Sequence, residues 1–335
     1  MKPPRLKDDC FALPPGVDWT PVNNAHARLR AVLHCVTGTE RVALMQAAGR
    51  FLAADVTAAR SNPPLPNSAV DGYGFAAAGT GAGVQILPLV AGRAAAGAPF
   101  DGAVPPGHAV RILTGAVLPS GVDTVVLEED VTSEDARIAF HGPVKPGANT
   151  RKAGEDVAEG ATVLAAGTRL RAPELAILSA VGVHKLSVRR PLRVGVLSTG
   201  DEIRPVGAEA RAHEIYDANR PMLLAQIAAW GYRPIDLGHV PDDRDALRMQ
   251  LDTAAERADV ILTSGGASAG DEDHVSALLT ETGTVEVWRV AVKPGRPLAL
   301  GLWRGVPVFG LPGNPVAAFV CTAVFAAPAV RVLVG

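Results

Sequence analysis

The sequence predicts an α/β plus β fold, in which a three-layer α/β domain is joined to a small β domain through an elongated connector. After Pro191, strand-like and helix-like segments alternate, which is the pattern of a mostly parallel sheet covered by helices on both faces. Between about residues 84 and 150, short apolar runs are separated by Gly/Pro clusters, as in a small β domain. The length of 335 residues fits about two domains at roughly 150 residues each.

The N-terminal half contains the connector and the β domain. Residues 21–60 are predicted to be helical because apolar residues such as Leu29 and Leu33 recur at helical spacing, with Asn23 or Asn24 as the cap. The strands of the β domain are predicted from the runs VQILPLV, HAVRILTG, DTVVLEED and ARIAF. A short helix is expected after Pro173. We therefore assign residues 1–60 and 150–190 to the connector, 61–149 to the β domain and 191–335 to the α/β domain.

The α/β domain is expected to contain six strands and four helices. The strands are predicted from the runs LRVGVLS, RPIDLGHV, DVILTSGG, TVEVWRVAV, PLALGLW and VPVFGLPG. Asn219 is the predicted cap of the first helix, NRPMLLAQIAAWG, and the last helix starts at Asn314. Since sheets of this kind bind ligands beyond the carboxyl ends of their strands, the loops that follow the strands are the candidate functional segments.

Composition excludes several classes of protein. A formal net charge of −2 lacks the basic excess of a duplex nucleic-acid binder. Cys10, Cys35 and Cys321 form no CxxC pair, so we expect free thiols and no structural zinc site. The first ten residues carry no apolar run, and the most apolar stretch, residues 316–330, is shorter than the roughly 20 residues that span a bilayer. We expect a cytoplasmic protein that binds neither membrane nor nucleic acid.

Five loops at predicted strand ends are dense in small and charged residues: STGDE, PDD, SGGASAGDEDH, KPGRP and LPGNP. Glycine residues let backbone N–H groups turn toward a bound anion, and the N-terminus of a helix favours the binding of phosphate. The residues of these loops that we expect to bind the ligand are Ser198, Thr199, Gly200, Ser264, Gly265, Gly266, Ser268, Gly270, Lys293, Arg296, Pro312, Gly313, Asn314 and Pro315.

The carboxylates of three of these loops should converge on one edge of the sheet. They would repel one another without a cation, and hard oxygen ligands suit Mg²⁺. The candidate metal ligands are Asp201, Glu202, Asp242, Asp243 and Asp273. Lys293 and Arg296 supply the opposite charge, an arrangement that suits phosphoryl transfer or phosphoanhydride hydrolysis. No P-loop pattern is present, which argues against ordinary ATP hydrolysis.

Several motifs in one order resemble the molybdopterin molybdenumtransferase family, whose members include the C-terminal domain of gephyrin. The resemblance covers about residues 20–330. It runs through SAVDGYG, RILTGAVLPSGVDTVV, RKAGEDVAEG, STGDEI, IYDANR, LGHVPDD, SGGASAGDEDH, AVKPGRPLALG and GLPGNPVAAF. It implies that the chain inserts molybdenum from molybdate into adenylylated molybdopterin, with Mg²⁺-dependent release of AMP.

The resemblance also implies roles for particular residues and a partner. The catalytic set that it indicates is Asp71, Thr114, Glu202, Asp242, Asp243 and Asp273. By chemistry alone, Asp71 and Thr114 would be ordinary polar residues on turns. Family members are elongated homodimers whose β domain meets the partner's α/β crevice, so we expect composite active sites. The upstream adenylyltransferase and downstream molybdenum-cofactor enzymes are candidate partners.

Two departures from the family pattern stand out. Arg289 replaces a lysine that often lies four positions before the lysine of KPGRP, and arginine keeps the charge. A further C-terminal β domain, which many members carry, is expected to be absent because the sequence ends at Gly335. Two alternative functions remain open at this stage: an adenylyltransferase acting one step earlier, and a non-catalytic scaffold of the same fold.

Overall fold

The contacts within the chain group it into two units, which we describe separately. The structure is a computed structural model that describes residues 20–265, 274–281, 285–290, 292 and 297–335. The α/β unit contains the described residues up to Glu40, Gly49–Ala53 and Ser187–Gly335, and the β unit contains Arg41–Ala48 and Ala54–Leu186. The three-part division expected from the sequence stays a prediction.

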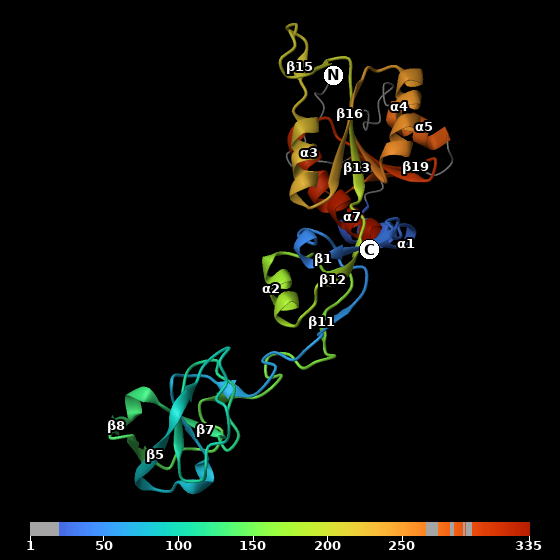
Figure 1. Cartoon of the computed structure of the whole chain (residues 1–335). Helices are drawn as coiled ribbons and strands as arrows, with labels where there is room; N and C mark the ends of the chain where they lie inside the picture. The colour runs from blue at the N-terminus through green and yellow to red at the C-terminus, as the bar shows by residue number, and fades with distance from the viewer. Residues whose placement is uncertain (1–19, 266–273, 282–284, 291, 293–296) are drawn as a thin grey trace, which may run out of the picture. The chain divides into compact units, whose positions relative to one another are not determined.

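A six-stranded mixed sheet organises the α/β unit (Figure 1). Its strands are β13 (Arg193–Thr199), β16 (Arg233–Val240), β17 (Val260–Ser264), β18 (Val285–Arg289), β19 (Pro297–Trp303) and β20 (Val306–Leu311). Their order is β16-β13-β17-β20-β19-β18, in which the first four strands run parallel and the last two are antiparallel. All six strands fall where the sequence predicts them.

Helices cover both faces of this sheet. They are α1 (Val22–Val32), α3 (Asn219–Ala229), α4 (Arg244–Arg257), α5 (His274–Glu281), α6 (Pro315–Cys321) and α7 (Ala327–Val334). One hydrophobic cluster joins α1, α3, α6 and α7 to Val194, Val196 and Leu262, whereas a second joins α4 and α5 to Leu197 and Ile261. Alternate residues of β13 and β17 thus pack on opposite faces, which produces the predicted three layers.

The C-terminal helices are part of the core. Together with the intervening π-helix η4 (Thr322–Ala326), α6 and α7 form a 20-residue span whose length and apolar composition alone would suit a membrane. It is the one such span within the described residues. Phe325 and Val330 are buried against the sheet, as the sequence-based expectation of a buried helix requires.

The helix expected over residues 21–60 is much shorter in the structure. Helix α1 ends at Val32, and strand β1 (Thr39–Ala43), 3₁₀-helix η1 (Leu44–Gln46) and strand β2 (Val56–Thr57) follow. Leu29 is buried, but Val32 is 60% exposed, so the apolar spacing does not continue as one buried stripe. Asn23 and Asn24 lie inside α1, and the cap position belongs to Pro21, which makes no side-chain cap bond. The predicted caps were therefore wrong.

The β unit contains a second six-stranded sheet, within the segment where the sequence predicts a small β domain from four apolar runs. Its order is β7-β4-β6-β5-β9-β8, with β5 and β6 parallel and the other pairs antiparallel. The strands are β4 (Gly72–Phe75), β5 (Gly83–Ala94), β6 (Ala109–Ile112), β7 (Thr124–Leu127), β8 (Thr132–Glu134) and β9 (Arg137–Gly142). Phe75 and Phe140 stack in its core with ring centroids 5.1 Å apart.

Shorter elements complete both units. They are η2 (Ala77–Gly79), η3 (Glu128–Asp130), β3 (Asn67–Ser68), β10 (Thr150–Arg151), β11 (Thr162–Leu164), α2 (Ala172–Ala180), β12 (Lys185–Arg189), β14 (Ile203–Arg204) and β15 (Ile215–Tyr216). The helix expected after Pro173 is α2, and at its start the Glu174 carboxylate accepts a hydrogen bond from the backbone N–H of Arg171 at 2.9 Å.

Candidate functional site

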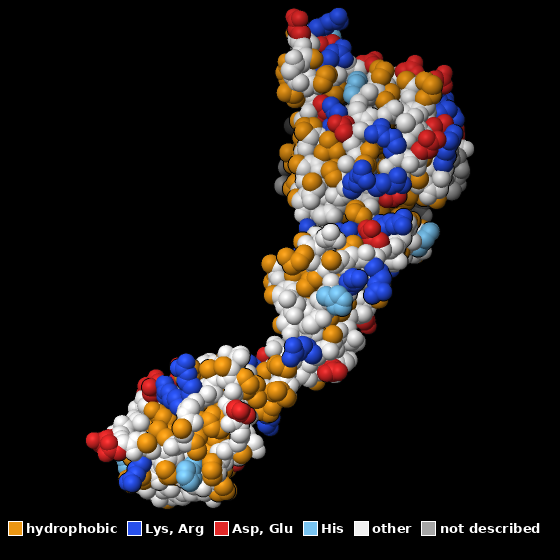
Figure 2. Space-filling view, viewed as in Figure 1, with side chains coloured by type: hydrophobic (Ala, Val, Ile, Leu, Met, Phe, Trp, Pro, Cys, Tyr) orange, Lys and Arg blue, Asp and Glu red, His pale blue; other side chains and the backbone are white. Residues whose placement is uncertain are grey.

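Two adjoining pockets lie at the carboxyl end of the α/β sheet. The larger, which we call the polar pocket, has a volume of about 860 Å³ and is lined by residues that include Asp201, Glu202, Arg204, Arg211, His239 and Asp242. Figure 2 shows charged side chains of both signs and a histidine at the end of the unit beside β15. The loops STGDE and PDD therefore meet here, as the sequence predicts.

Asp201 and Asp242 hold these two loops together by a reciprocal pair of hydrogen bonds. The backbone N–H of Asp242 donates to Asp201 Oδ1 at 3.0 Å, and the backbone N–H of Asp201 donates to Asp242 Oδ2 at 3.3 Å. Each carboxylate uses one oxygen for this contact. The second oxygen of each is thereby positioned by a bond that also fixes the loop backbone.

Asp243 caps a helix, unlike the neighbouring Asp242. Its Oδ1 accepts a hydrogen bond from the backbone N–H of Ala246 at 2.7 Å, which makes it the N-cap of α4. Within the described residues, no three His, Cys, Asp or Glu side chains are grouped so that they could hold a metal ion. Asp273 lies outside the described residues. The five-residue metal set thus stays a prediction, and capping already accounts for Asp243.

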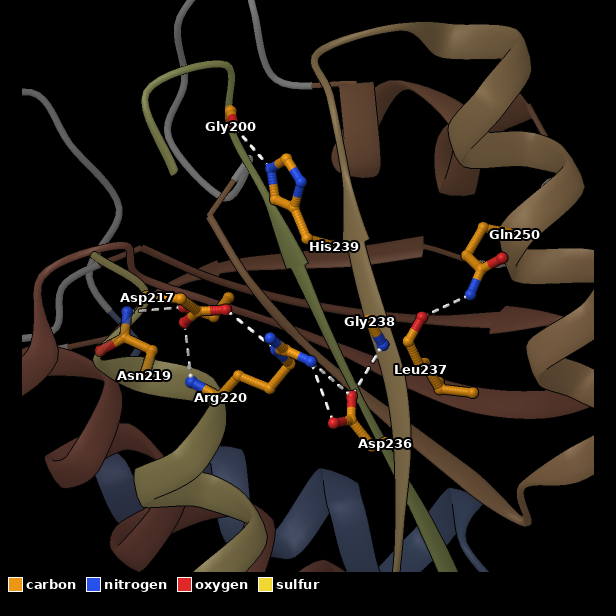
Figure 3. Close-up of polar contacts among 10 residues, drawn as sticks. Gly200, Asp217, Asn219, Arg220, Asp236, Leu237, Gly238, His239 and Gln250 are labelled. Carbon is orange, nitrogen blue, oxygen red and sulfur yellow. Dashed lines mark hydrogen bonds and ion pairs between the residues drawn. The ribbon is translucent and has the colours of Figure 1, made fainter. Parts of the chain in front are cut away.

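Glu202 and His239 both contact Gly200 in the STGDE loop. Gly200 has a φ of 137°, and a β-carbon added there would lie 2.5 Å from Glu202 Oε2. The backbone conformation therefore favours glycine, whereas the Glu202 carboxylate is the end of a flexible side chain and could move away from a β-carbon. His239 Nε2 lies 2.7 Å from the carbonyl oxygen of Gly200, and because a carbonyl can only accept, this nitrogen carries a proton (Figure 3).

The smaller pocket, which we call the Asn219 pocket, has a volume of about 350 Å³. It is lined by residues that include Ser198, Thr199, Ile215, Tyr216, Asn219 and Gly313. Glu202 lines both pockets and therefore stands between them. Asn314, Pro315, Ser264 and Gly265 also line the Asn219 pocket, so the STGDE and LPGNP loops and the first two residues of the SGGASAGDEDH loop converge on it.

Asn219 was predicted to cap α3, and this was wrong. It is the first residue of the helix, and its side-chain amide nitrogen donates to Ser264 Oγ at 2.6 Å and to the carbonyl oxygen of Gly313 at 2.7 Å. The backbone N–H of Arg220 is instead bound by Asp217 Oδ1 at 3.0 Å. Asn219 thus ties the start of α3 to the ends of β17 and β20.

Arg220 links α3 to a bulge in β16 (Figure 3). Its guanidinium donates to buried Asp217 at 3.0 Å and to both carboxylate oxygens of Asp236 at 2.8 and 2.9 Å. Asp236 Oδ1 also accepts from the backbone N–H of Gly238, where φ is 79°. Burial alone would raise the pKa of Asp236, but the hydrogen bond from Arg220 lowers it below its ordinary value.

In the LPGNP loop, Asn314 caps the helix that follows. Asn314 Oδ1 accepts from the backbone N–H groups of Val316 and Ala317 at 3.0 and 3.1 Å and so caps α6, the cap expected from the sequence. The remaining predicted residues of this half lie outside the described residues: Gly266, Ser268, Gly270, Asp273, Lys293 and Arg296.

In the β unit, Asp71 and Thr114 are in direct contact. Asp71 Oδ1 accepts from the hydroxyl of Thr114 at 2.6 Å and from its backbone N–H at 2.7 Å. Nearby, Arg111 pairs with Glu128 at 2.5 Å and lies over the ring of Tyr73, 5.0 Å from its centroid. The turn after β6 is thereby fixed to the start of β4, with the Asp71 carboxylate exposed.

Two family models match the chain over both units. The MoeA N-terminal region (domain I and II) matches residues 20–182, and the probable molybdopterin binding domain matches residues 195–332. A protein of Haemophilus influenzae named molybdopterin molybdenumtransferase is 39% identical over 301 residues, which are 89% of this chain and 74% of that protein. The chain belongs to the molybdopterin molybdenumtransferase family.

Other relatives agree in sequence and in fold. The molybdopterin molybdenumtransferase of a Nostoc species is 36% identical over 304 residues, which are 89% of this chain and 70% of that protein. The crystal structure of the molybdopterin biosynthesis moeA protein from Pyrococcus horikoshii has a TM-score of 0.78 at 30% identity, covering 95% of this chain and 80% of that one. Both pockets of this chain lie in the segment that matches the molybdopterin binding domain.

The sequence analysis of this family member missed Arg220, Asp236 and His239. Arg220 lies in IYDANR and His239 in LGHVPDD, whereas Asp236 directly precedes LGHVPDD, and the motifs by themselves assign none of the three a contact. One signal is present in RPIDLGHV, where Gly238 interrupts the strand two residues after a carboxylate. A glycine within a strand often marks a bulge, and a carboxylate close to it can accept from the backbone N–H there.

Proposed function

We propose that this member of the family inserts molybdenum from molybdate into adenylylated molybdopterin and releases AMP. The observation that carries the proposal is the pair of pockets that share Glu202. One is rich in charged groups and the other in neutral polar groups. A substrate that joins ring systems to a pyrophosphate needs both environments, because the charged link and the rings have different partners.

Magnesium is proposed to bind at the polar pocket. Asp201, Glu202 and Asp242 line this pocket, and carboxylate oxygens are the ligands that a hard cation prefers, although these side chains are not grouped as a metal site in the described residues. We include Asp273 from the sequence pattern. When bound, the ion would neutralise charge that develops on the phosphate during cleavage of the phosphoanhydride. Asp201 and Asp242 would orient it, since each is held by the other's backbone N–H.

Lys293 and Arg296 are proposed to hold the anionic molybdate. They flank a Pro-Gly dipeptide that shortly precedes β19 in the sequence. Charge-assisted hydrogen bonds from such side chains favour oxyanions. Arg289 would add a third positive charge in this segment.

We also propose a cytoplasmic homodimer whose active sites combine both subunits. Support comes from the sequence resemblance, which implies catalytic roles for Asp71 and Thr114 of the β unit as well as for Glu202 and Asp242 of the α/β unit. A two-fold interface would form two such composite sites at once.

The proposal is tested by incubating the purified protein with adenylylated molybdopterin, molybdate and Mg²⁺. We expect AMP release that requires all three, with one molybdenum inserted per AMP formed. Glu202→Gln should reduce the rate by roughly two orders of magnitude, the typical effect of losing one charged group at a reacting centre. Glu134→Gln, on exposed strand β8, serves as the matched control. AMP formation that is independent of molybdate, or an active Glu202→Gln enzyme, would contradict the proposal.

A further inference from the structure

Three neighbouring strands of the β unit bring charged residues together around Asp71. Asp71 directly precedes β4, Arg111 lies in β6 and Glu128 directly follows β7, and these strands are adjacent in the order β7-β4-β6. The backbone N–H of Glu128 donates to the carbonyl oxygen of Asp71 at 3.2 Å. Gly72 permits this close pairing, because a β-carbon there would lie 1.9 Å from the carbonyl oxygen of Val126. The backbone therefore holds Asp71 and Glu128 beside each other.

Arg111 is fixed by three different contacts. It stands directly opposite Tyr73 in the antiparallel pair of β4 and β6, and its guanidinium lies over the Tyr73 ring. Its Nη2 donates to Glu128 Oε2 at 2.5 Å, and its Nη1 donates to the carbonyl oxygen of Gly72 at 3.5 Å. A ring face, a carboxylate and a carbonyl together hold the positive charge of Arg111 in one place.

The Asp71 carboxylate has one oxygen in use and one available. Both hydrogen bonds from Thr114 reach Oδ1, whereas no donor to Oδ2 is found in the part of the chain that the structure describes. These bonds lower the pKa of Asp71, and the positive charge of Arg111 lowers it further. Arg111 thus acts on this exposed carboxylate through its charge, without a direct hydrogen bond.

A carboxylate that meets an anionic substrate needs a compensating charge to stay ionised. A pyrophosphate link and molybdate are both negative, and their approach would raise the pKa of Asp71 because like charges disfavour ionisation. Thr114 is neutral and cannot offset this effect. Arg111 keeps its positive charge at every working pH, and Glu128 neutralises part of it. The ion pair therefore determines how strongly Asp71 is kept ionised.

We propose that Arg111 is a positioning residue for the reaction, which keeps Asp71 ionised when the anionic substrate binds, and that Glu128 moderates this effect. Arg111 acts through Asp71 and does not touch the reacting atoms. The inference rests on the proposed function, since that function includes Asp71 in the catalytic set. It goes further by giving the reaction two additional residues of the β unit.

The first measurement is the titration of Asp71 in the full chain without substrates, followed by carboxyl carbon NMR. Arg111→Met keeps an apolar stem over the Tyr73 ring but removes the charge, so the pKa of Asp71 should rise. Arg111→Lys keeps the charge and should restore most of the lowering. Glu128→Gln still accepts a hydrogen bond from Arg111 but removes a negative charge, so the pKa of Asp71 should fall below that of the wild type. A turn that was merely loosened would raise this pKa in every variant.

The second measurement is the pH dependence of AMP release. The acid limb of kcat reports the ionisation of Asp71 in the substrate complex, so it should move to higher pH in Arg111→Met and to lower pH in Glu128→Gln. On this limb kcat follows the ionised fraction of Asp71, and Arg111→Met should lose roughly tenfold there. The KM for adenylylated molybdopterin should stay the same, because Arg111 does not touch the substrate.

Arg171→Met is the matched control, because it removes another arginine of the β unit that is paired with a glutamate. It should change neither the titration of Asp71 nor the pH dependence of AMP release. An unchanged Asp71 titration in Arg111→Met, a higher pKa in Glu128→Gln, or an acid limb that stays fixed in both variants would overturn the inference. The two failures are distinguishable, because a wild type that releases no AMP refutes the proposed function, whereas an active wild type with unshifted variants refutes only the role of Arg111.

Discussion

Thr114 donates two hydrogen bonds to a single oxygen of Asp71, one from its hydroxyl at 2.6 Å and one from its backbone N–H at 2.7 Å. The hydroxyl contact, then the backbone contact, lowers the pKa of Asp71 below its ordinary value of 3.8. The carboxylate is thus held ionised and oriented even though it is exposed to solvent.

Thr114→Val should raise the pKa of Asp71, because the strongest of these contacts is lost. A carboxylate whose pKa is lowered by folding stabilises the protein above its unfolded pKa, and this contribution disappears as the pH falls through the folded pKa. The variant should therefore melt below the wild type at neutral pH, and the two melting temperatures should converge below the pKa of folded Asp71. Carboxyl carbon NMR titration gives the pKa directly. Thr132→Val, on exposed β8, is the control, and an unmoved Asp71 titration in Thr114→Val would refute the assignment.

Asp242 and Asp243 should respond differently to the same substitution. Asp242→Asn removes a carboxylate from the polar pocket, so we expect a loss of Mg²⁺-dependent AMP release. Asp243→Asn should stay active, since asparagine and aspartate cap helices equally well. Asp243→Ala should lose about 1 kcal/mol of folding free energy in urea unfolding. An inactive but fully folded Asp243→Asn enzyme would show that this carboxylate reaches the reaction itself.

Removing Arg220 should destabilise the α/β unit more than removing an exposed arginine. Arg220→Met leaves the Asp217 side chain, which is only 4% exposed, without its cation, and we expect a loss of about 3 kcal/mol. Arg171→Met breaks a pair with Glu174 whose arginine is 69% exposed, so its loss should be at most about 0.5 kcal/mol. Denaturant unfolding measures both. Equal free energies of unfolding for the two variants would show that the contacts of Arg220 with Asp217 and Asp236 do not stabilise the fold.

Mixed dimers test the proposed sharing of active sites. Asp71→Ala and Asp273→Ala are each expected to be inactive alone. When they are co-expressed with different tags, the doubly tagged dimer should regain part of the activity, because one of its two sites combines the intact halves. A mixed dimer as inactive as its parents would mean that Asp71 acts within its own subunit or only in folding.

The three layers of the α/β unit were predictable because their signal is local. Strands β13 and β17 are buried on both faces, so LRVGVLS and DVILTSGG appear as continuous apolar runs. The prediction of a helix over residues 21–60 was wrong, because apolar residues continue at helical spacing beyond Val32, where α1 ends. Leu33 already has an extended backbone, with ψ of 142°.

The roles of the polar residues were less predictable because they depend on distant partners. Asparagine is a residue type that often caps helices, and Asn219 lies at the start of a helix. Its amide nevertheless donates to Ser264 and Gly313, which are 45 and 94 residues away in the sequence. Aspartate is a common metal ligand, but the Asp243 carboxylate caps helix α4. Residue type limits what a side chain can bind, whereas the fold decides which of those partners is within reach.

The bulge in β16 has a consequence for how relatives should be aligned. Val196 pairs with Asp236 and Ser198 with His239, so Leu237 and Gly238 together stand opposite Leu197. As a result, Leu237 and Val240 pack in the same cluster with α4 although they are three positions apart, a spacing that breaks the two-residue period of a strand. If Gly238 were aligned as an ordinary paired position of a regular strand, His239 would face α4 and Val240 the opposite side, which would separate the imidazole from the Gly200 carbonyl. The three-residue apolar spacing is therefore the marker by which homologous chains can be placed in register with this strand.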